Sequence, residues 1–192
     1  MWVTGIVLAA GLSRRAGADN KLLSPFEGRP VVRATVEAVC AAGLDEVLVV
    51  TGHERAAVEA ALRGLPVAFV RAEDFSAGMG RSLAAGVAAA AAQADGFAVV
   101  PGDLPWLRAA TVREVVAAFR EGRPPMHVVP VAAGRRGHPV VLGAWLREAL
   151  CRLQGDAGAR GLLAAPAERI RTRRVEVTDS GIWRDVDFGY GG

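Results

Sequence analysis

Short apolar segments typical of buried strands alternate with helix-like segments along almost the whole chain. This alternation predicts an α/β fold with a mostly parallel sheet, because each helix can carry the chain back across the sheet to the next strand. We expect strands at residues 3–9, 46–51, 66–71, 97–101, 126–131, 139–142, 169–177 and 182–187. We expect helices at residues 30–42, 54–63, 81–94, 145–153 and 161–165, and another that Thr111 caps and that runs to about residue 120.

Length and composition favour a single domain over residues 1–192. A chain of 192 residues that is 52% hydrophobic can bury one sizeable core, and no polar linker divides it. Cys40 and Cys151 lie in apolar helical patterns without the spacing of metal ligands, which indicates core thiols in a reducing compartment. Neither a signal-peptide pattern nor an apolar run of roughly 18 residues is present, so we expect a cytoplasmic protein without membrane contact.

Charge gives a weak indication of partners. The formal net charge is +3, and acidic and basic residues are interspersed along the chain. Nucleic-acid binding is therefore permitted but not indicated. Of the 23 lysines and arginines, one is a lysine, Lys21. A compact ammonium at that one position suggests a role that a planar guanidinium cannot fill.

A glycine-rich segment follows the first expected strand and closes on Lys21. Glycines let the backbone approach a phosphate, and consecutive N–H groups can form an anion-binding concavity at the carboxyl edge of the sheet. Arg15 and Lys21 would then neutralise phosphate charge. This is not a Walker loop, because Leu22 follows the lysine where serine or threonine is required. The alternative is a glycine-rich turn with solvated arginines.

Two carboxylate motifs are candidates for metal binding. Asp103 lies between Gly102 and Leu104 at the end of an expected strand, where a carboxylate can hold Mg²⁺ together with phosphates. Asp185 and Asp187 occupy alternate positions of an extended segment, which places both on one side. The alternatives are a turn-forming role for Asp103 and solvated tail positions for the other two.

A third glycine motif, Gly78-Met79-Gly80, precedes the helix expected at residues 81–94. Its N–H groups, with Ser82 in the first turn, can face a base or an acceptor phosphate. The motif is also similar to part of a dinucleotide fingerprint. Leu83 occupies the position of the third glycine and no strand precedes the motif, which disfavours NAD binding.

With these motifs in this order, the chain resembles the MobA-like NTP transferases over residues 3–187, and among them the CTP-using molybdenum cofactor cytidylyltransferases of the MocA type. The motifs that carry the resemblance are Leu8-Ala9-Ala10-Gly11 with Arg15, Gly17 and Lys21; Gly102-Asp103-Leu104-Pro105; Gly78-Met79 with Ser82, Leu83 and Gly86; Gly137-His138-Pro139; and Leu153-Gln154-Gly155-Asp156-Ala157-Gly158-Ala159-Arg160. In the family, an alanine at the position of Ala10 accompanies CTP and a glycine accompanies GTP. The resemblance implies a three-layer, Rossmann-like nucleotide-diphospho-sugar transferase fold with a mixed, mostly parallel sheet.

The resemblance also implies a reaction. A terminal phosphate of molybdopterin attacks the α-phosphorus of CTP, and pyrophosphate leaves. Because that phosphate is already anionic near neutral pH, no histidine need act as a general base. Arg15, Lys21 and Asp103 would be catalytic, and Asp103 with Asp187 would hold Mg²⁺. The nucleotide-binding residues would be Leu8, Ala9, Ala10, Gly11, Arg15, Lys21, Gly78, Ser82 and Gly102.

For the acceptor, the resemblance implies contacts from His138, Asp156 and Arg160. The alternatives are a buried structural histidine and an aspartate that caps the following helix. The product would pass to an apo-molybdoenzyme or its maturation chaperone. Two other functions remain open: a nucleotidyltransferase for another phosphorylated small molecule, using GTP or a sugar phosphate, and a non-catalytic cofactor-binding maturation protein.

Overall fold

The computed structural model describes residues 1–11, 20–122, 125–156 and 158–186. The strands are β1 (Val3–Ala9), β2 (Pro25–Phe26), β3 (Arg29–Pro30), β4 (Glu46–Thr51), β5 (Ala68–Arg71), β6 (Gly96–Pro101), β7 (His127–Ala132), β8 (Arg135–Arg136), β9 (Val140–Gly143) and β10 (Thr172–Glu176). The α-helices are α1 (Val31–Cys40), α2 (Arg55–Ala61), α3 (Met79–Ala89), α4 (Ala109–Glu121), α5 (Arg147–Cys151), α6 (Arg160–Ala164) and α7 (Pro166–Ile170). Short 3₁₀ helices lie at Lys21–Leu23, Phe75–Ala77, Ala144–Leu146 and Ser180–Ile182.

The main sheet has the strand order β10-β7-β9-β6-β1-β4-β5, and β8 pairs with β7. Strands β6, β1, β4 and β5 are parallel neighbours, and β10 is parallel to β7. Strand β9 is antiparallel to both of its neighbours. The carboxyl ends of β1, β4 and β6 therefore meet the amino end of β9 at one edge of the sheet. A separate two-stranded sheet joins β2 to β3.

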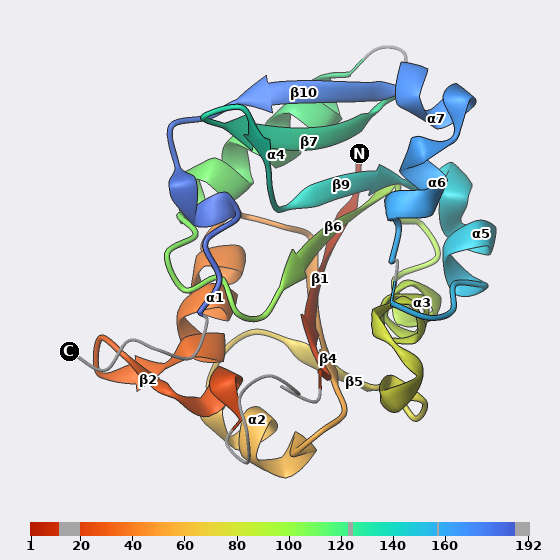
Figure 1. Ribbon diagram of the computed structural model, residues 1–192. Coiled ribbons are helices and arrows are strands. Elements are labelled where there is room, and N and C mark those ends of the chain that lie inside the picture. Colours follow the sequence, from red (N-terminus) through yellow and green to blue (C-terminus); the bar gives the residue numbers. More distant parts are fainter. Residues whose placement is uncertain (12–19, 123–124, 157, 187–192) are drawn as a thin grey trace.

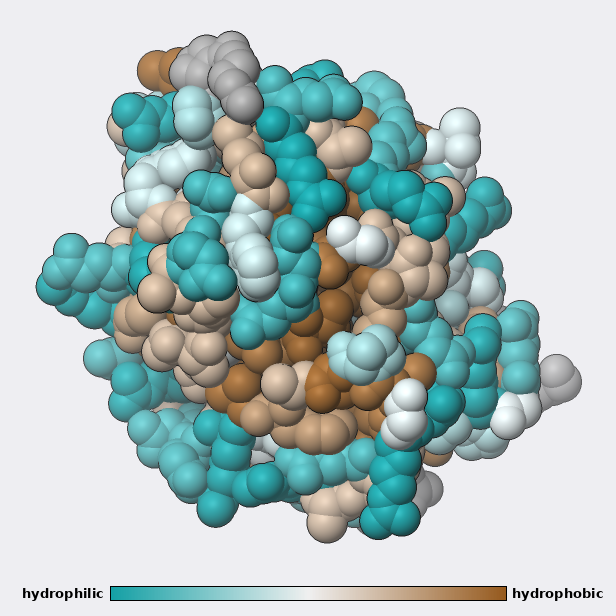
Figure 2. Space-filling model, turned by 180° about the vertical axis from the view of Figure 1, so that it is seen from behind, coloured by the Kyte–Doolittle hydropathy of each residue, from teal (hydrophilic) through white to brown (hydrophobic). Residues whose placement is uncertain are grey.

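Helices cover both faces of the main sheet, with α1, α2 and α4 on one side and α3, α5 and α6 on the other (Figure 1). Alternate residues of each central strand point to opposite faces, so Val3 and Val7 pack in the core under α1 and α4, whereas Ile6 packs in the core under α3. On the side of the molecule opposite to the view of Figure 1, apolar residues gather centrally within a hydrophilic surround (Figure 2). Among the described residues, no helix is long and apolar enough to cross a membrane.

The structure confirms most of the expected elements and corrects three. The strand expected at residues 169–177 begins only at Thr172, because residues 166–170 form α7. The segment expected to form a strand at residues 182–187 begins instead in the 3₁₀ helix Ser180–Ile182, and no strand is found up to residue 186. Thr111 does not cap its helix. Helix α4 begins two residues earlier, at Ala109, and the Thr111 hydroxyl donates a hydrogen bond to Asp179. Because α4 begins at Ala109, Thr111 lies inside the first turn and not at the capping position, and its hydroxyl bonds instead to the carboxylate that the C-terminal segment brings to the helix start.

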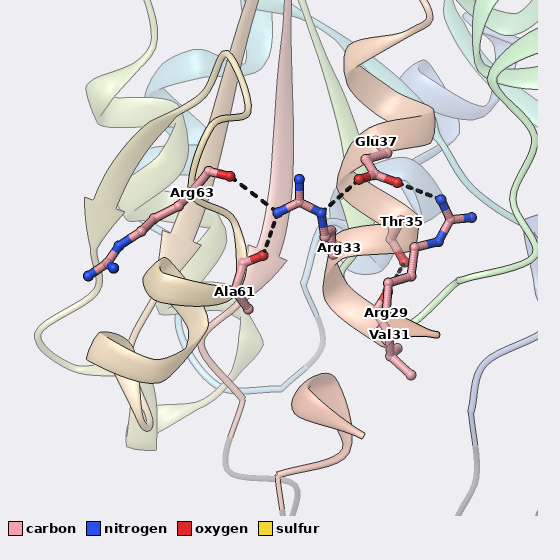
Figure 3. A network of polar contacts seen from close by, with 7 residues as sticks. All are labelled: Arg29, Val31, Arg33, Thr35, Glu37, Ala61 and Arg63. Atoms are coloured by element: carbon pink, nitrogen blue, oxygen red, sulfur yellow. Dashed lines mark hydrogen bonds and ion pairs between the residues drawn. The ribbon is translucent and has the colours of Figure 1, made fainter. Parts of the chain in front are cut away.

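Arg33 joins α1 to the end of α2 (Figure 3). Its Nη1 donates to the carbonyl oxygens of Ala61 and Arg63 at 2.9 and 3.2 Å, which satisfies acceptors that the helix end leaves without intrahelical partners. Its Nε donates to Glu37, which also accepts from Arg29 of β3. The network therefore attaches the β2–β3 hairpin to the helical layer, close to the segment that carries Lys21.

His127 is fully buried at the start of β7 and joins two neighbouring elements. Its Nδ1 accepts a hydrogen bond from the Gly143 N–H at 3.0 Å, so its Nε2 must carry the proton that is donated to Glu168 at 2.8 Å. Trp145 Nε1 donates to the same carboxylate and its ring contacts the imidazole. Burial lowers the pKa of His127, although the hydrogen bond and charge of Glu168 act in the opposite direction.

The lowered pKa of His127 makes stability depend on pH. The folded state favours the neutral ring, so this contribution is complete above the unfolded-state pKa of about 6.5 and is lost as the pH falls below it. We expect His127→Gln to be less stable than the wild type by about 1–2 kcal/mol at neutral pH. The difference should narrow between about pH 7 and pH 5.5, which urea unfolding of both proteins across this range would measure. A constant difference would contradict the assigned protonation state.

Candidate active site

The turn after β1 is held between the ends of its two neighbouring strands. Gly102 N–H donates to the Leu8 carbonyl at 2.9 Å, and His53 N–H donates to the Ala10 carbonyl at 3.3 Å. A Cβ on Gly102 would lie 3.0 Å from the Leu8 oxygen, so this close approach favours glycine. Ala9 and Ala10 are buried and Gly11 is exposed. The predicted nucleotide-binding run therefore ends at the carboxyl edge of the sheet.

Lys21 lies in the first position of a 3₁₀ helix that two neighbours fix in place. The Asn20 side chain accepts a hydrogen bond from Leu22 N–H at 3.1 Å, and Leu22 is buried in the core. This cap is a local role that suits asparagine. The Lys21 ammonium reaches Asp103 Oδ2 at 2.5 Å. The structure thus brings together two residues, 82 positions apart in the sequence, that were both predicted to be catalytic.

Asp103 is held through its backbone as well as its side chain. Its carbonyl oxygen accepts a hydrogen bond from Val186 N–H at 3.2 Å. The side chain is only 16% exposed, compared with 25% for the Lys21 side chain. The contact with Lys21 and the backbone hydrogen bond together hold the Asp103 carboxylate in a fixed position. A catalytic or metal-binding group requires such a fixed position.

His138 lies close to Asp103 because β9 runs antiparallel to β6. Its Nδ1 donates to the Val99 carbonyl at 3.2 Å, which leaves Nε2 as the acceptor nitrogen. Burial lowers the pKa of His138, while the Val99 hydrogen bond and the charge of Asp103 act in the opposite direction. The neutral ring can therefore accept a hydrogen bond from a ligand at neutral pH. A neutral, half-buried His138 is compatible with the predicted contact to the acceptor substrate and also with a purely structural role.

The predicted residues on the α3 side form a second group at the same edge. Gly80 N–H donates to the Gly155 carbonyl at 2.7 Å, and a Cβ on Gly78 would lie 2.7 Å from Asp156 Oδ1. Gly78 has a φ of +113° and its own N–H donates to Phe75. Thus the amides of Gly78 and Gly80 already have partners in the protein, which restricts what this turn offers a ligand.

Other members of the predicted site differ in how accessible they are. Ser82 is buried in the first turns of α3, whereas Asp156 and Arg160 are exposed. Arg15 and Asp187 lie outside the described residues. In the part of the chain that the structure describes, no group of three or more His, Cys, Asp or Glu residues is arranged to hold a metal ion.

A hollow of about 430 Å³ adjoins this edge beyond the ends of β4 and β5. No motif in the sequence indicated it. Two ion pairs, Arg55–Glu59 and Arg71–Glu73, place positively and negatively charged side chains on its walls. Its lining residues are Gly52, Arg55, Ala56, Glu59, Arg71, Ala72, Glu73 and Phe75.

The sheet order and layers are those of an α/β domain with the fold of the nucleotide-diphospho-sugar transferases. Residues 5–172 match the model of the MobA-like NTP transferase domain. The chain belongs to this family of nucleotidyltransferases.

Three relatives cover nearly the whole chain. Nicotine blue oxidoreductase of Paenarthrobacter nicotinovorans is 35% identical over 190 residues, which cover 96% of this chain and 92% of that protein. The structure of Mth528, a nucleotidyl transferase of Methanothermobacter, has 31% identity and a TM-score of 0.77, and covers 92% of this chain and 87% of that one. Rv0371c of Mycobacterium tuberculosis, crystallised with manganese, has 29% identity and a TM-score of 0.75, and covers 93% and 89% of the two chains.

Proposed function

We propose that the chain transfers CMP from CTP to the terminal phosphate of a molybdopterin-type cofactor and releases pyrophosphate. The observation that carries this proposal is the meeting of Lys21 and Asp103 beside the Leu8–Gly11 turn. Membership of the MobA-like family supports nucleotidyl transfer. The choice of cytidine rests on Ala10, by resemblance to the CTP-using branch.

The proposed reaction requires positioning and charge neutralisation more than proton transfer. An acceptor phosphate oxygen attacks the α-phosphorus in line, the bond from the α-phosphorus to the bridging oxygen breaks, and its electron pair leaves with pyrophosphate. Lys21 would exchange its contact with Asp103 for phosphate oxygens when the nucleotide binds. Arg15 is the second proposed cation. Both would stabilise charge that develops on the leaving group.

The residues around Asp103 suit a divalent cation. Mg²⁺, the proposed cofactor, takes oxygen ligands and retains several waters, so one or two carboxylates and the substrate phosphates suffice. Asp103 supplies one carboxylate on a fixed backbone, and Asp187 is the second proposed ligand. When bound, the metal would neutralise charge on the reacting phosphates. The manganese in the Rv0371c structure supports a divalent cation in this family.

On the acceptor side, we propose contacts from His138, Asp156 and Arg160. Support comes from the proximity of His138 to Asp103 and from the exposure of Asp156 and Arg160 beside α3. The imidazole Nε2 would accept a hydrogen bond from the pterin, and Arg160 would contact its polar edge. Delivery to an apo-molybdoenzyme or its maturation chaperone is the proposed fate of the product.

Pyrophosphate release tests this function directly. The assay combines the protein, Mg²⁺, molybdopterin or its molybdate form, and CTP, GTP, ATP or UTP in parallel reactions. We expect release with CTP that depends on the acceptor. If pyrophosphate is released only with a different phosphorylated acceptor, that compound would replace molybdopterin as the proposed substrate. If nucleotide binds but no pyrophosphate is released, the result would favour a non-catalytic maturation protein.

A second candidate function comes from the 35% identity to a protein named nicotine blue oxidoreductase. In this alternative, the chain would catalyse a redox reaction on a dye of the nicotine blue type instead of transferring a nucleotide. Oxidation of NADH or NADPH in the presence of a blue dye acceptor, followed at the nicotinamide absorbance, would identify this activity. Its absence, together with CTP-dependent pyrophosphate release, would exclude it.

A further inference from the structure

Asp179 is a buried carboxylate outside the predicted site and is only 3% exposed. Its Oδ2 accepts hydrogen bonds from Arg108 N–H at 3.0 Å and from the Thr111 hydroxyl at 2.7 Å. Its Oδ1 accepts from Gly181 N–H at 2.9 Å. One side chain therefore joins the start of α4 to the 3₁₀ helix Ser180–Ile182.

This carboxylate acts as a cap supplied from a distant part of the chain. Arg108, the residue that precedes α4, makes no side-chain capping bond of its own. Asp179 accepts its backbone N–H instead, and a negative charge at a helix N-terminus is favourable. A buried carboxylate that accepts three hydrogen bonds is costly to disturb, because each donor would lose its partner.

The segment that Asp179 holds, residues 179–186, contacts both candidate site loops. Ile182 is fully buried and its carbonyl accepts from His138 N–H at 2.7 Å. Four residues later, Val186 N–H donates to the Asp103 carbonyl at 3.2 Å. The 179–186 segment is thus hydrogen-bonded to the backbone of both Asp103 and His138.

Close packing leaves this segment little freedom to shift. A Cβ on Gly181 would lie under 3 Å from the backbone of Trp106, three residues after Asp103. A Cβ on Gly137 would similarly overlap the backbone of Ile182. A displacement of the 179–186 segment would therefore be transmitted to both loops.

We propose that Asp179 is a positioning residue of the candidate active site. By holding the 179–186 segment against the start of α4, it fixes the loop that carries Asp103 and the turn that carries His138. The expected effect of Asp179 on turnover rests on the proposed transferase function. Its expected effect on the positions of the two loops is independent of that function.

The test compares three variants. Asp179→Asn keeps the shape of the side chain but replaces one acceptor oxygen with an NH₂ group that must face a donor. Thr111→Val removes one donor and leaves the carboxylate in place. Asp45→Asn is the matched control, because Asp45 accepts from Val3 N–H at 2.8 Å and from Arg120 at 2.6 Å at the opposite edge of the sheet.

Amide hydrogen exchange of the full chain supplies a readout independent of activity. We expect faster exchange in Asp179→Asn for the peptides that cover residues 101–108, 132–143 and 179–186, a smaller increase in Thr111→Val, and none in Asp45→Asn. In the transferase assay, kcat of Asp179→Asn should fall about 100-fold, since small misplacements of reacting groups cost this much, while KM for the nucleotide changes little. Asp45→Asn should retain its kcat.

Unchanged exchange around His138 in Asp179→Asn, or an equal loss of kcat in Asp45→Asn, would overturn the proposal. If Asp179→Asn does not fold, exchange in Thr111→Val at the same three peptides tests the proposal instead. If the wild type transfers no nucleotide, the proposed function fails, and the exchange result still decides whether Asp179 positions the two loops.

Discussion

Replacing Lys21 with alanine should reduce nucleotidyl transfer by about 10²–10³-fold, the range observed when one preorganised group that stabilises transition-state charge is removed. The Lys21 ammonium lies 2.5 Å from Asp103 Oδ2 at the edge where the nucleotide is proposed to bind. The loss should fall mainly on kcat, because the charge on the leaving pyrophosphate is greatest in the transition state. Steady-state kinetics with CTP and the acceptor would measure it.

Two comparisons separate this effect from a general loss of positive charge. Lys21→Arg retains the charge but replaces a compact ammonium with a planar fork, so we expect only partial activity. Arg29→Ala removes a neighbouring exposed cation of the β2–β3 hairpin and should retain activity, because its ion pair with Glu37 lies away from Asp103. Equal losses in Lys21→Ala and Arg29→Ala would contradict a specific role for Lys21.

The sequence offers a chemical version of this test. Lys21 is the one lysine of the chain, so an amine-directed acylating reagent can modify only this side chain and the α-amino group. We expect acylation of Lys21 to abolish transfer and CTP to protect it. Peptide mass spectrometry would locate the modification, and retained activity after complete acylation of Lys21 would count against the proposed role.

Asp103→Asn is the second change with a large expected effect, a loss of turnover of at least about 100-fold. Asparagine keeps the shape of the side chain and removes the negative charge that would hold Mg²⁺. The Asp103–Lys21 pair is partly exposed, so the stability cost should stay within about 1 kcal/mol. Activity titrated with Mg²⁺ and Mn²⁺ would show whether the variant also requires a higher metal concentration.

The control for Asp103→Asn is Asp95→Asn. Asp95 directly precedes β6, so it lies at the amino edge of the sheet, opposite to Asp103, and its carboxylate accepts a hydrogen bond from Trp2 N–H. We expect normal transfer in this control. An active Asp103→Asn enzyme with an unchanged metal requirement would show that the metal is held elsewhere.

The central parallel strands could be predicted because burial on both faces makes them nearly continuous apolar runs. The strands β1 and β4 agree with their expected bounds, and β6 differs by one residue. Strand direction was harder, because a short apolar run does not show whether it will pair parallel or antiparallel. The antiparallel placement of β9 is what brings His138 beside Asp103.

The C-terminal segment shows where local patterns were insufficient. Alternation after Ile182 predicted a strand, but Asp179 caps a 3₁₀ helix and the next residues bond to loops that are distant in sequence. The Asp179-Ser180-Gly181 triplet is typical of a turn in which the aspartate accepts a backbone N–H. This local signal could have predicted the turn, but not the contact with Thr111 68 positions away.

In the candidate site, residues within motifs could be predicted from the sequence, whereas the residues that support them could not. Lys21 and Asp103 stood out because their motifs combine glycines with a charged residue, and the fold joins them. Asn20 and Asp179 were missed as supporting residues, since capping and buried hydrogen bonds depend on which groups the fold brings together. The hollow beside β4 and β5 was missed because its lining comes from two separate stretches of chain, within residues 52–59 and 71–75.

The most direct test of nucleotidyl transfer follows the α-phosphate itself. CTP labelled in its α-phosphate is incubated with the protein, Mg²⁺ and molybdopterin, and the products are separated. We expect the label to move to a cytidine dinucleotide of the pterin in an amount equal to the pyrophosphate released, and we expect Lys21→Ala and Asp103→Asn to lose this transfer. Label that stays in CTP, or appears only in free CMP, with every phosphorylated acceptor tried would contradict the proposed transfer.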